Sequence, residues 1–479
     1  MASAKAIPLL TPISATLSLL ITFLISAHAG EVRYVKPENE TDCYGLSPCY
    51  PLGYYVGNSS SYFISDTVFQ FSPGTHILDS EISQVVLIEN VTRLSLIGNG
   101  SIPTHHPLSP IEIYCQGATG FAFVNAIELT LENLTLIGCG QVITFSLLNA
   151  SSTRAALAFD MISKLHIYEI VVVNSSGFGI YAQRVFGNSS IASSIFAYNS
   201  GSPNYDGGNA IFWYADCPYA SDTSLLYIGF SEFLYGDASH INPLATGLTL
   251  WLECTNIDVD IYNVTLIGNT GENSNTGGNL AIFYRNRTDI IRNMVTVRNC
   301  YVANGNAYYG GGMYVSVFDT PTHNENPQIL AFLHEPVGPL ANESIPELLN
   351  IFNTHFVNNH ARFEGGGLYI IVQEVIGVYY PIGRIIVHNC SFEGNTMLIV
   401  NDGGIAAHVV NTYAPEFLPH GIPQFKVLFI ESMFPIINQL LPKGPLPFLL
   451  REVQWYLLYR TFQEQISLTV HSPITTAQQ

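Results

Sequence analysis

The sequence predicts an all-β protein: a right-handed parallel β-helix solenoid of about nine or more coils, with a cap at each end. A seven-residue apolar motif, which we call the frame, recurs through residues 85–412 and usually ends in Asn. Glycine pairs follow several frames and lead into another short apolar strand. Only 11% of the 479 residues are charged and 39 are Gly, a composition that favours a turn-rich solenoid over a helical enzyme.

The first 29 residues have the pattern of a secretory signal peptide. An apolar segment from Thr16 to Ala27 follows Lys5, and Ala27-His28-Ala29 provides a small-x-small cleavage pattern. An uncleaved membrane anchor is the alternative, because residues 6–30 carry no charge, but two prolines and several Ser and Thr in this segment disfavour it. We therefore predict cleavage after Ala29 and a secreted, extracellular chain without a transmembrane span.

Both ends of the repeat need covering, because a bare solenoid end exposes strand edges and core. Residues 30–84 are predicted to cap the first coil. Residues 413–479 are predicted to form a partly helical C-terminal cap, since apolar residues within 449–460 recur every three to four positions. A membrane-surface helix is the alternative for this segment, but its charges form no basic face.

The frame is clearest in Asn263-Val-Thr-Leu-Ile-Gly-Asn269 and Asn389-Cys-Ser-Phe-Glu-Gly-Asn395. Its second and fourth positions share one strand face and are small or apolar, so that face is predicted to be buried. The Asn at position 7 suits the left-handed conformation at a strand end, and stacked coils would align these residues into an inward ladder. The fourth positions are predicted to form one interior column: Leu96, Leu136, Phe196, Leu266, Val302, Phe356 and Phe392.

The cysteines and sequons agree with secretion. The cysteine number is even, and spacing suggests three disulfides without determining their connectivity: Cys43 with Cys49, Cys115 with Cys139, and Cys217 with Cys254. Cys300 and Cys390 lie two coils apart at the same frame position, too far for a disulfide, and are predicted to be buried thiols. Metal binding by cysteine is disfavoured because no Cys-x-x-Cys occurs.

Glycosylation is predicted at several of the twelve Asn-x-Ser/Thr sequons: Asn39, Asn58, Asn263, Asn286, Asn342 and Asn389. The sequon at Asn342 falls in a Pro- and Asn-rich insertion at about residues 318–348, which is predicted to loop out. Asn99 and Asn174 are expected to remain unmodified, because they occupy the predicted inward ladder.

The Phe-x-x-Asn motif with a downstream Gly-Gly is the repeat signature of polymorphic outer-membrane-type β-helices. Phe196–Asn199, Phe356–Asn359 and Phe392–Asn395 match it. The chain therefore resembles pectin-lyase-like right-handed parallel β-helix proteins, in particular the uncharacterised secreted β-helix-repeat proteins of sponges. The resemblance covers residues 85–412 and implies the fold, while this superfamily holds lyases, hydrolases, adhesins and inert scaffolds.

The resemblance to pectate lyases implies Ca²⁺ held by acidic side chains, with an Arg or Lys base. Asp258 and Asp260 share one strand face and Arg298 follows one coil later, although a solvated charged face explains this pattern equally well. Asp206, Glu364 and Asp402 each precede a glycine pair and are either a Ca²⁺ row or turn-favoured residues. Polygalacturonase-like chemistry is disfavoured, because the chain lacks Asp-Asp and Arg-x-Lys.

The net charge of −19 and the scattered lysines argue against nucleic-acid binding. We predict a non-catalytic structural, adhesive or recognition role without a cofactor, with an extracellular glycan or protein as partner. A neutral ligand suits the charge-poor composition and its 27 Tyr better than an acidic polysaccharide. The alternative is a Ca²⁺-dependent, polysaccharide-lyase-like enzyme. A stacked aromatic and carboxylate groove on an outer sheet would favour an enzyme or a glycan-binding protein over a scaffold.

Overall fold

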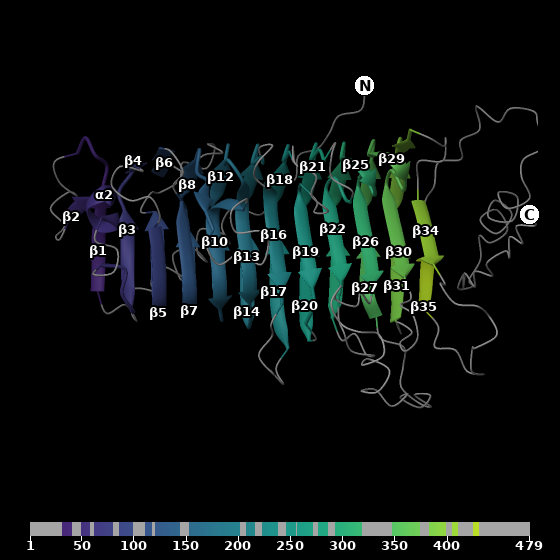
Figure 1. The fold of residues 1–479 in the computed structure, drawn as a ribbon, viewed down its shortest axis with the longest axis horizontal. Helices are drawn as coiled ribbons and strands as arrows, with labels where there is room; N and C mark the ends of the chain where they lie inside the picture. Colours follow the sequence, from purple (N-terminus) through teal and green to yellow (C-terminus); the bar gives the residue numbers. More distant parts are fainter. Residues whose placement is uncertain are drawn as a thin grey trace, which may run out of the picture.

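A computed structural model shows a long solenoid of short strands whose two larger sheets run along most of its length (Figure 1). The ranges described by the structure are 31–40, 49–57, 62–79, 86–98, 111–116, 120–143, 153–201, 207–215, 223–237, 246–254, 256–271, 276–285, 293–318, 347–373, 383–398, 405–410 and 425–430. Three sheets, which we call the wide, narrow and small sheets, contain 22, ten and three strands of this part.

The wide sheet consists of two rows of strands, joined where the long strands β5 and β7 run through both rows. The first row contains β5 (Val86–Gly98), β7 (Phe121–Glu132), β10 (Arg154–Ile162), β13 (Phe178–Val185), β16 (Gly208–Tyr214), β19 (Leu248–Leu252), β22 (Leu280–Tyr284), β26 (Met313–Phe318), β30 (Leu368–Gln373) and β34 (Ile405–Val410). The second row also contains β2 (Cys49–Pro51), β1 (Glu31–Lys36), β3 (Thr67–Phe71), β11 (Leu165–Tyr168), β14 (Asn188–Ala192), β17 (Ser224–Gly229), β20 (Ile257–Tyr262), β23 (Met294–Arg298), β27 (Glu347–Phe352), β31 (Gly383–His388) and β35 (Phe425–Ile430).

The narrow sheet closes the third side of each coil, and the small sheet is added next to the later coils. The narrow sheet contains β4 (Gly74–Asp79), β6 (Ile111–Gln116), β8 (Thr135–Ile137), β12 (Val171–Val173), β15 (Ile195–Ala197), β18 (Glu232–Leu234), β21 (Thr265–Ile267), β24 (Tyr301–Ala303), β28 (His355–Val357) and β32 (Ser391–Glu393). The small sheet contains β25 (Asn306–Tyr309), β29 (His360–Glu364) and β33 (Thr396–Met397).

Successive coils pair in parallel, strand on equivalent strand, as in β10 with β13 and β13 with β16. Within the described residues the exception is the short strand β9 (Gln141–Val142), which pairs with β10 antiparallel. This parallel stacking confirms the predicted parallel β-solenoid. The helix α2 (Leu52–Val56) lies next to β2 and β4 at the N-terminal end, and none of the described helices is long and apolar enough to span a membrane.

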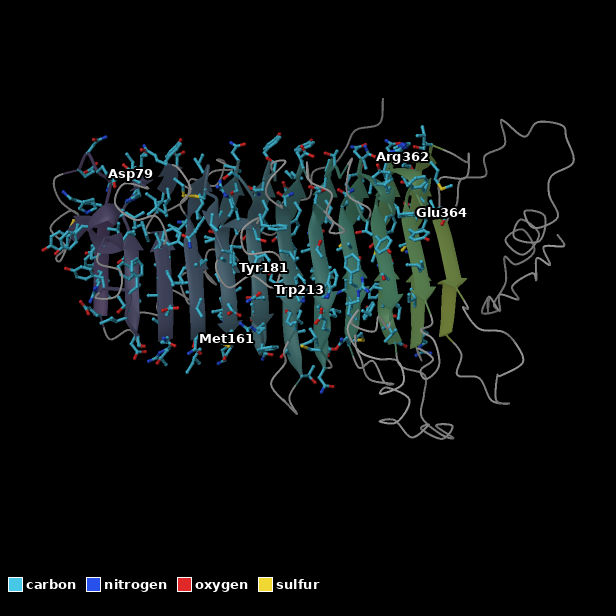
Figure 2. The ribbon with its side chains drawn as sticks, in the orientation of Figure 1. Asp79, Met161, Tyr181, Trp213, Arg362 and Glu364 are labelled. Carbon is cyan, nitrogen blue, oxygen red and sulfur yellow. A yellow bond between two sulfur atoms is a disulfide. The ribbon has the colours of Figure 1, made fainter. Side chains whose placement is uncertain are left out.

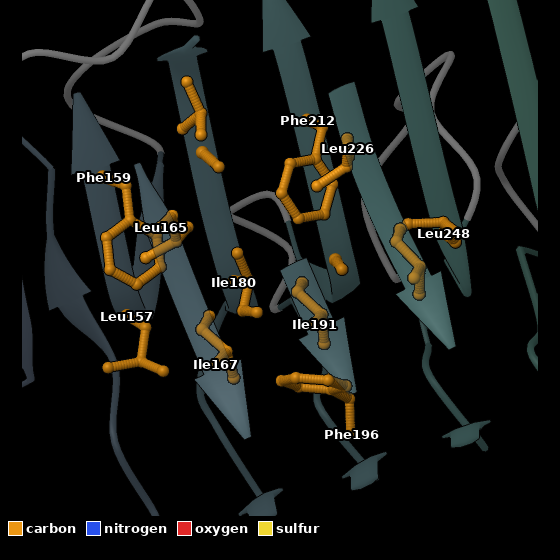
Figure 3. Packing of buried hydrophobic residues seen from close by; sticks show 14 of the residues in the cluster. Leu157, Phe159, Leu165, Ile167, Ile180, Ile191, Phe196, Phe212, Leu226 and Leu248 are labelled. Carbon is orange, nitrogen blue, oxygen red and sulfur yellow. The ribbon is translucent and has the colours of Figure 1, made fainter. Parts of the chain in front are cut away.

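The predicted interior column exists in the narrow sheet. Its paired residues are all at most 3% exposed, and Phe356 stacks on Phe392 with 4.7 Å between ring centroids. Figure 3 shows Phe196 of this column beside Ile191 of the second row, inside the coil. The column runs, in order, through Ile113, Leu136, Val172, Phe196, Phe233, Leu266, Val302, Phe356 and Phe392.

Leu96 is buried but does not belong to this column, so its predicted position is wrong. It lies on β5 of the wide sheet, where it pairs with Phe69 of β3 and Leu131 of β7. The chain at residues 93–99 resembles the frame because any half-buried strand alternates apolar and polar residues before a turn. Only the strand pairing distinguishes the two sheets.

Each three-residue strand of the narrow sheet lies between two residues with positive φ, at frame positions 1 and 6. Such a conformation is unfavourable for most side chains but tolerated by Asn and Gly. The predicted left-handed Asn at position 7 is therefore wrong by one residue. Typical occupants are Asn133, Asn263, Asn299, Asn353 and Asn389 at position 1, and Gly138, Gly268, Asn304, Asn358 and Gly394 at position 6.

Position 7 instead supplies the buried Asn ladder that the sequence predicts. The side-chain Nδ2 of each Asn donates to the Oδ1 of the next at distances of 2.7–3.0 Å. In the fully buried part of the ladder, the Nδ2 also donates to a backbone carbonyl of a neighbouring coil. Two members, Asn209 and Asn279, follow glycine pairs rather than frames. The ladder runs through Asn199, Asn209, Asn269, Asn279, Asn359 and Asn395.

Asn174 is exposed and does not belong to the ladder, which contradicts its predicted inward position. The frame there is out of register by one residue, because Val172 and not Val171 lies in the interior column. Ser175 therefore occupies the ladder position, and its backbone N–H donates to Asn199 Oδ1 at 3.0 Å. Asn99 lies outside the described residues.

Of the six asparagines predicted to carry glycans, three are described by the structure and three are not. Asn39, Asn263 and Asn389 are exposed, as a glycan requires. Asn58, Asn286 and Asn342 lie outside the described residues, as does the insertion at 319–346.

One predicted disulfide is confirmed. Cys115 and Cys139 are bonded, joining β6 to the turn after β8, with 4.8 Å between their Cα atoms. Cys49 and Cys254 are also disulfide-bonded, while their predicted partners, Cys43 and Cys217, lie outside the described residues.

Cys300 and Cys390 are buried thiols, as predicted. Burial raises the pKa of each thiol to about 11, because the thiolate would lose its hydration. Native protein at pH 8 is therefore expected to resist alkylation by iodoacetamide at both residues, and protein unfolded in urea to react rapidly. Unfolded thiols ionise near pH 8.5–9, so these two residues should lower the free energy of unfolding, and thus the stability of the fold, as pH rises from about 9 to 11. Peptide mass spectrometry checks the first result, and native labelling as fast as in urea would contradict it.

Candidate functional site

The structure brings together two of the three lyase-like residues. Asp260 projects outward from β20, and Arg298 at the end of β23 donates from Nε and Nη2 to its two carboxylate oxygens at 2.9 and 2.7 Å. The Arg298 guanidinium also lies 4.3 Å from the ring centroid of Tyr262. A Ca²⁺ ion at Asp260 would therefore have to displace a bidentate guanidinium.

Arg298 is unsuited to act as a base, because its hydrogen bond to Asp260 raises its pKa further above its ordinary value. Asp258 lies on the same face, and its carboxylate accepts a long bond of 3.3 Å from the backbone N–H of Met294. Partial burial raises the pKa of Asp258. These contacts describe a paired surface charge rather than an open cation site.

The predicted acidic row cannot be followed along the solenoid. Glu364 lies on β29 of the small sheet, close to Tyr369. The pKa of Tyr369 is raised by burial and by the nearby Glu364 carboxylate. Asp206 and Asp402 lie outside the described residues. Within the described ranges, no group of three or more His, Cys, Asp or Glu side chains is arranged to hold a metal ion.

The outward face of the first row carries a different feature, a continuous line of aromatic side chains. The centroids of successive rings in this line are 4.8–5.6 Å apart. Figure 2 shows this face, with Trp213 near the middle of the solenoid and Arg362 near its C-terminal end. We call the line the aromatic belt, and its members in order are Trp213, Trp251, Phe283, Tyr314, Tyr369, Tyr309, Phe363 and Tyr308.

The N-terminal end of the belt combines two indoles with two charges. Nε1 of Trp251 and of Trp213 donate to the same oxygen of Glu253, at 2.6 and 3.3 Å. The Arg285 guanidinium lies 4.8 Å from the Trp251 ring centroid, and burial lowers its pKa. Trp213 and Trp251 are half-buried, whereas Phe283, Tyr314 and Tyr369 farther along the belt are at most 6% exposed.

A buried ion pair lies near this end of the belt. Arg184 donates to both oxygens of Asp160 at 2.7 and 2.5 Å, and the Asp160 side chain is only 3% exposed. Between this pair and Trp213 lies Gln183, which accepts from the Tyr181 hydroxyl at 3.3 Å. The carboxylates and guanidiniums of this region, Asp160, Arg184, Glu253 and Arg285, balance in formal charge.

The C-terminal end of the belt opens into a hollow of about 260 Å³ on the small sheet. Arg362 lies 5.0 Å from the Tyr308 ring centroid, and its Nη1 donates to the Tyr308 hydroxyl at 2.9 Å. His360 is also present, its Nδ1 hydrogen-bonded to Thr396 at 2.9 Å. The lining residues are Asn306, Ala307, Tyr308, His360, Arg362 and Leu398.

Arg362 differs from most described arginines in its partners. Five others form ion pairs with carboxylates: Arg33, Arg93, Arg184, Arg298 and Arg384. Among the residues that the structure describes, no carboxylate lies within ion-pair distance of Arg362, and its guanidinium is exposed on two rings. The remaining donors of this guanidinium are therefore accessible to a ligand.

Sequence reasoning missed both the belt and the hollow. One signal was present: Trp213 and Phe283 each follow the second glycine of a Gly-Gly-Asn turn by five residues, which places them on one face. The hollow left no such signal, because β25 and β29 belong to a sheet that forms only in the later coils. Tyr308 and Arg362 are 54 residues apart and meet only through that stacking.

No protein-family model matches the chain, and no curated protein matches its sequence. Among solved structures, the A-module of a mannuronan C-5 epimerase from Azotobacter vinelandii aligns with a TM-score of 0.33 and 11% identity, covering 80% of this chain and 94% of the module. The catalytic unit of an α-1,3-glucanase from Streptomyces thermodiastaticus aligns with a TM-score of 0.28 and 11% identity, covering 79% and 66%. The fold itself defines the class of this protein, a parallel β-solenoid with a largely buried line of stacked aromatic side chains along one row of strands.

Proposed function

We propose that this protein is a secreted, non-catalytic glycan-binding solenoid, and that a neutral oligosaccharide binds in the hollow at the end of the aromatic belt. One observation carries the proposal: the Arg362 guanidinium lies exposed on the Tyr308 ring, in a hollow, without a carboxylate partner among the described residues. A concave site with an aromatic wall and a few convergent polar groups is typical of small-ligand binding.

The chemistry of the lining suits a sugar. A sugar ring has apolar C–H faces, which pack on aromatic rings, and hydroxyl groups, which need both donors and acceptors. Tyr308 and Leu398 provide the apolar surface, while Arg362, His360 and Asn306 provide the polar groups. The volume of about 260 Å³ lies below the range of roughly 300–1,000 Å³ that is usual for ligand pockets, so the hollow is expected to hold only one end of an oligosaccharide.

Charge favours a neutral ligand over an acidic one. The chain has a net charge of −19, which repels polyanions from the whole surface. A uronate polymer carries a charge on every sugar, and one guanidinium in the hollow would balance only one of them. The charges near the other end of the belt already balance one another, so they offer no excess positive charge to such a polymer.

The lining favours binding over cleavage. Most glycoside hydrolases use two carboxyl groups on either side of the scissile bond, and none of the described residues that line the hollow is Asp or Glu. The lyase-like alternative needs an available carboxylate set and a base, whereas Asp260 and Arg298 are engaged with each other. Both facts support a recognition role.

Three observations support an extracellular location. The N-terminus has the signal-peptide pattern, the Cys115–Cys139 disulfide is typical of an oxidising compartment, and exposed sequons are present. Together they support a site outside the cell, where polysaccharides are available.

Replacing Arg362 by Ala is expected to weaken binding of a neutral oligosaccharide about 10- to 100-fold, because a hydrogen bond from a charged group contributes roughly 1.5–3 kcal/mol. Tyr308→Ala should weaken it similarly through loss of the aromatic wall. The measurement is calorimetric titration of purified mature protein with oligosaccharides chosen from a neutral and acidic polysaccharide array.

Arg93→Ala serves as the matched control, since Arg93 is a surface arginine on β5, distant from the hollow, that pairs with Asp66. It should bind like the wild-type protein. Binding of uronate chains only, equal loss in Arg93→Ala, or release of unsaturated or reducing ends with or without Ca²⁺ would each overturn the proposal.

A further inference from the structure

Three aromatic residues occupy backbone positions that disfavour them. Tyr198, Phe230 and Tyr235 have φ values of 56°, 52° and 50°, and among the described residues they are the only aromatic side chains with positive φ. They lie at frame positions 1 and 6, where most other coils have Asn or Gly. A bulky side chain in the left-handed region is unfavourable, so it requires a compensating interaction.

Burial in the protein core does not provide that compensation. Tyr198, Phe230 and Tyr235 are 55%, 53% and 46% exposed. The two tyrosine rings stack with 5.1 Å between centroids, and the Tyr235 ring lies over Gly268, where an added Cβ would come within 2.5 Å of its Cδ1. One side of this two-ring stack is therefore closed by Gly268, and the other side, the outer face of Tyr198, is directed toward the preceding coil.

The residue at the same position of that preceding coil is Asn174, the first residue of an Asn-Ser-Ser sequon. Asn174 is exposed, has a φ of 56°, and its backbone N–H donates to the carbonyl of Ala197, the neighbour of Tyr198. Equivalent residues of adjacent parallel coils lie about 4.8 Å apart. Asn174 and Tyr198 are therefore neighbours at the same position of adjacent coils, and both are exposed.

Phe230 lies one coil before a second sequon, and its ring also meets that of Tyr262 edge to face, with 5.2 Å between centroids. It occupies position 1 of its frame, and position 1 of the next coil is Asn263, which begins an Asn-Val-Thr sequon and is exposed. The backbone N–H of Phe230 donates to the carbonyl of Tyr262, the neighbour of Asn263. A strained, exposed aromatic residue therefore lies one coil from a sequon at the same position in both cases.

We propose that Asn174 and Asn263 carry N-linked glycans, and that the sugar attached to each amide packs against the Tyr198 and Phe230 rings. The C–H face of a sugar ring on an aromatic face buries apolar surface and adds weak C–H contacts, which offsets the unfavourable backbone conformation. This assignment replaces the expectation that Asn174 remains unmodified. It requires secretion but is independent of the proposed ligand in the hollow.

Hydroxyl-radical footprinting with peptide-resolved mass spectrometry tests the packing, because exposed Tyr and Phe rings are both oxidised. Ser176→Ala and Thr265→Val remove the two sequons while leaving Asn174 and Asn263, with their backbone conformations, in place. In secreted wild-type protein both asparagines should carry glycan. Tyr198 oxidation should be several-fold slower than in Ser176→Ala, and Phe230 oxidation several-fold slower than in Thr265→Val.

Tyr301 is the internal reference for Ser176→Ala, because it is 41% exposed and lies four coils from Asn174 along the narrow sheet. Its oxidation should not change.

Loss of the glycan in Ser176→Ala is also expected to lower the melting temperature. Glycine occupies the position of Tyr198 in other coils, so Tyr198→Gly should fold, and in that background Ser176→Ala should no longer lower the melting temperature. The proposal is wrong if either Asn is unoccupied in the secreted protein, or if Tyr198 and Phe230 are oxidised equally with and without glycan. Oligosaccharide binding in the hollow should be unaffected by Ser176→Ala, which separates the two proposals.

Discussion

Replacing Asn269 by Ala is expected to lower the free energy of unfolding by more than about 4 kcal/mol, because one change leaves several buried groups without partners. The Asn269 side chain accepts from the Gly236 N–H and from Asn209 Nδ2, both at 2.8 Å. It donates to the Phe233 carbonyl at 2.9 Å and to Asn279 Oδ1 at 2.7 Å. The residue is fully buried, so water cannot replace these bonds without entering the core. Urea unfolding followed by circular dichroism measures the change.

Asn353→Gly is the matched control for the ladder variant. Asn353 belongs to an exposed row at frame position 1, where it donates to Asn299 at 3.1 Å and accepts from Asn389 at 2.8 Å. Glycine fits its φ of 51°, and water can satisfy the groups left behind, so a loss below about 1 kcal/mol is expected. Equal losses for the two variants would mean that the buried ladder does not hold the coils together.

Replacing Phe356 by Ala is expected to cost about 3–5 kcal/mol, the range for removing a buried phenylalanine and leaving a cavity. Phe356 is fully buried in the interior column between Val302 and Phe392, and its ring stacks on that of Phe392 at an interplanar angle of 1°. Coils on both sides lose contacts, because a solenoid buries its core only between neighbours. The unfolding free energy from urea titration reports the loss.

Tyr301→Ala tests whether the cost arises from the column rather than from any aromatic residue of the narrow sheet. Tyr301 is in the preceding coil, next to Val302, but faces outward and is 41% exposed. Its removal should change the unfolding free energy by less than about 1 kcal/mol. A loss comparable with that of Phe356→Ala would contradict the assignment of the two faces.

Much of the fold could be read from local pattern. Alternation in a three-residue strand distinguishes an inner from an outer face, so the column from Leu136 to Phe392 was predictable. The buried thiols Cys300 and Cys390 followed from the same alternation. The frame also contained the Asn that forms the ladder, although the glycine-turn members Asn209 and Asn279 were not recognised.

Register was predictable only where the pattern was strong. At residues 168–174 a run of three valines fits two alignments, and the sequence-based alignment placed Asn174 inside rather than outside. At 93–99 a wide-sheet strand has the same apolar alternation as the frame, and Leu96 was assigned to the wrong column. A one-residue shift reverses every side chain, so such errors change which residues are accessible to a ligand or a glycan.

The sequence by itself determined the repeating β architecture and the inner faces, because these depend on spacing within or between adjacent coils. Spacing only suggested the disulfide between Cys115 and Cys139, which the structure confirms. Only the tertiary structure decided which outer surfaces are candidates for function. The aromatic belt joins residues as far apart as Trp213 and Tyr369, and the hollow joins residues as far apart as Asn306 and Leu398. The pairing of Asn174 with Tyr198 depends on the exact stacking of two coils. The physical reason is that outward side chains in a solenoid meet their neighbours across coils, where sequence distance varies with every loop.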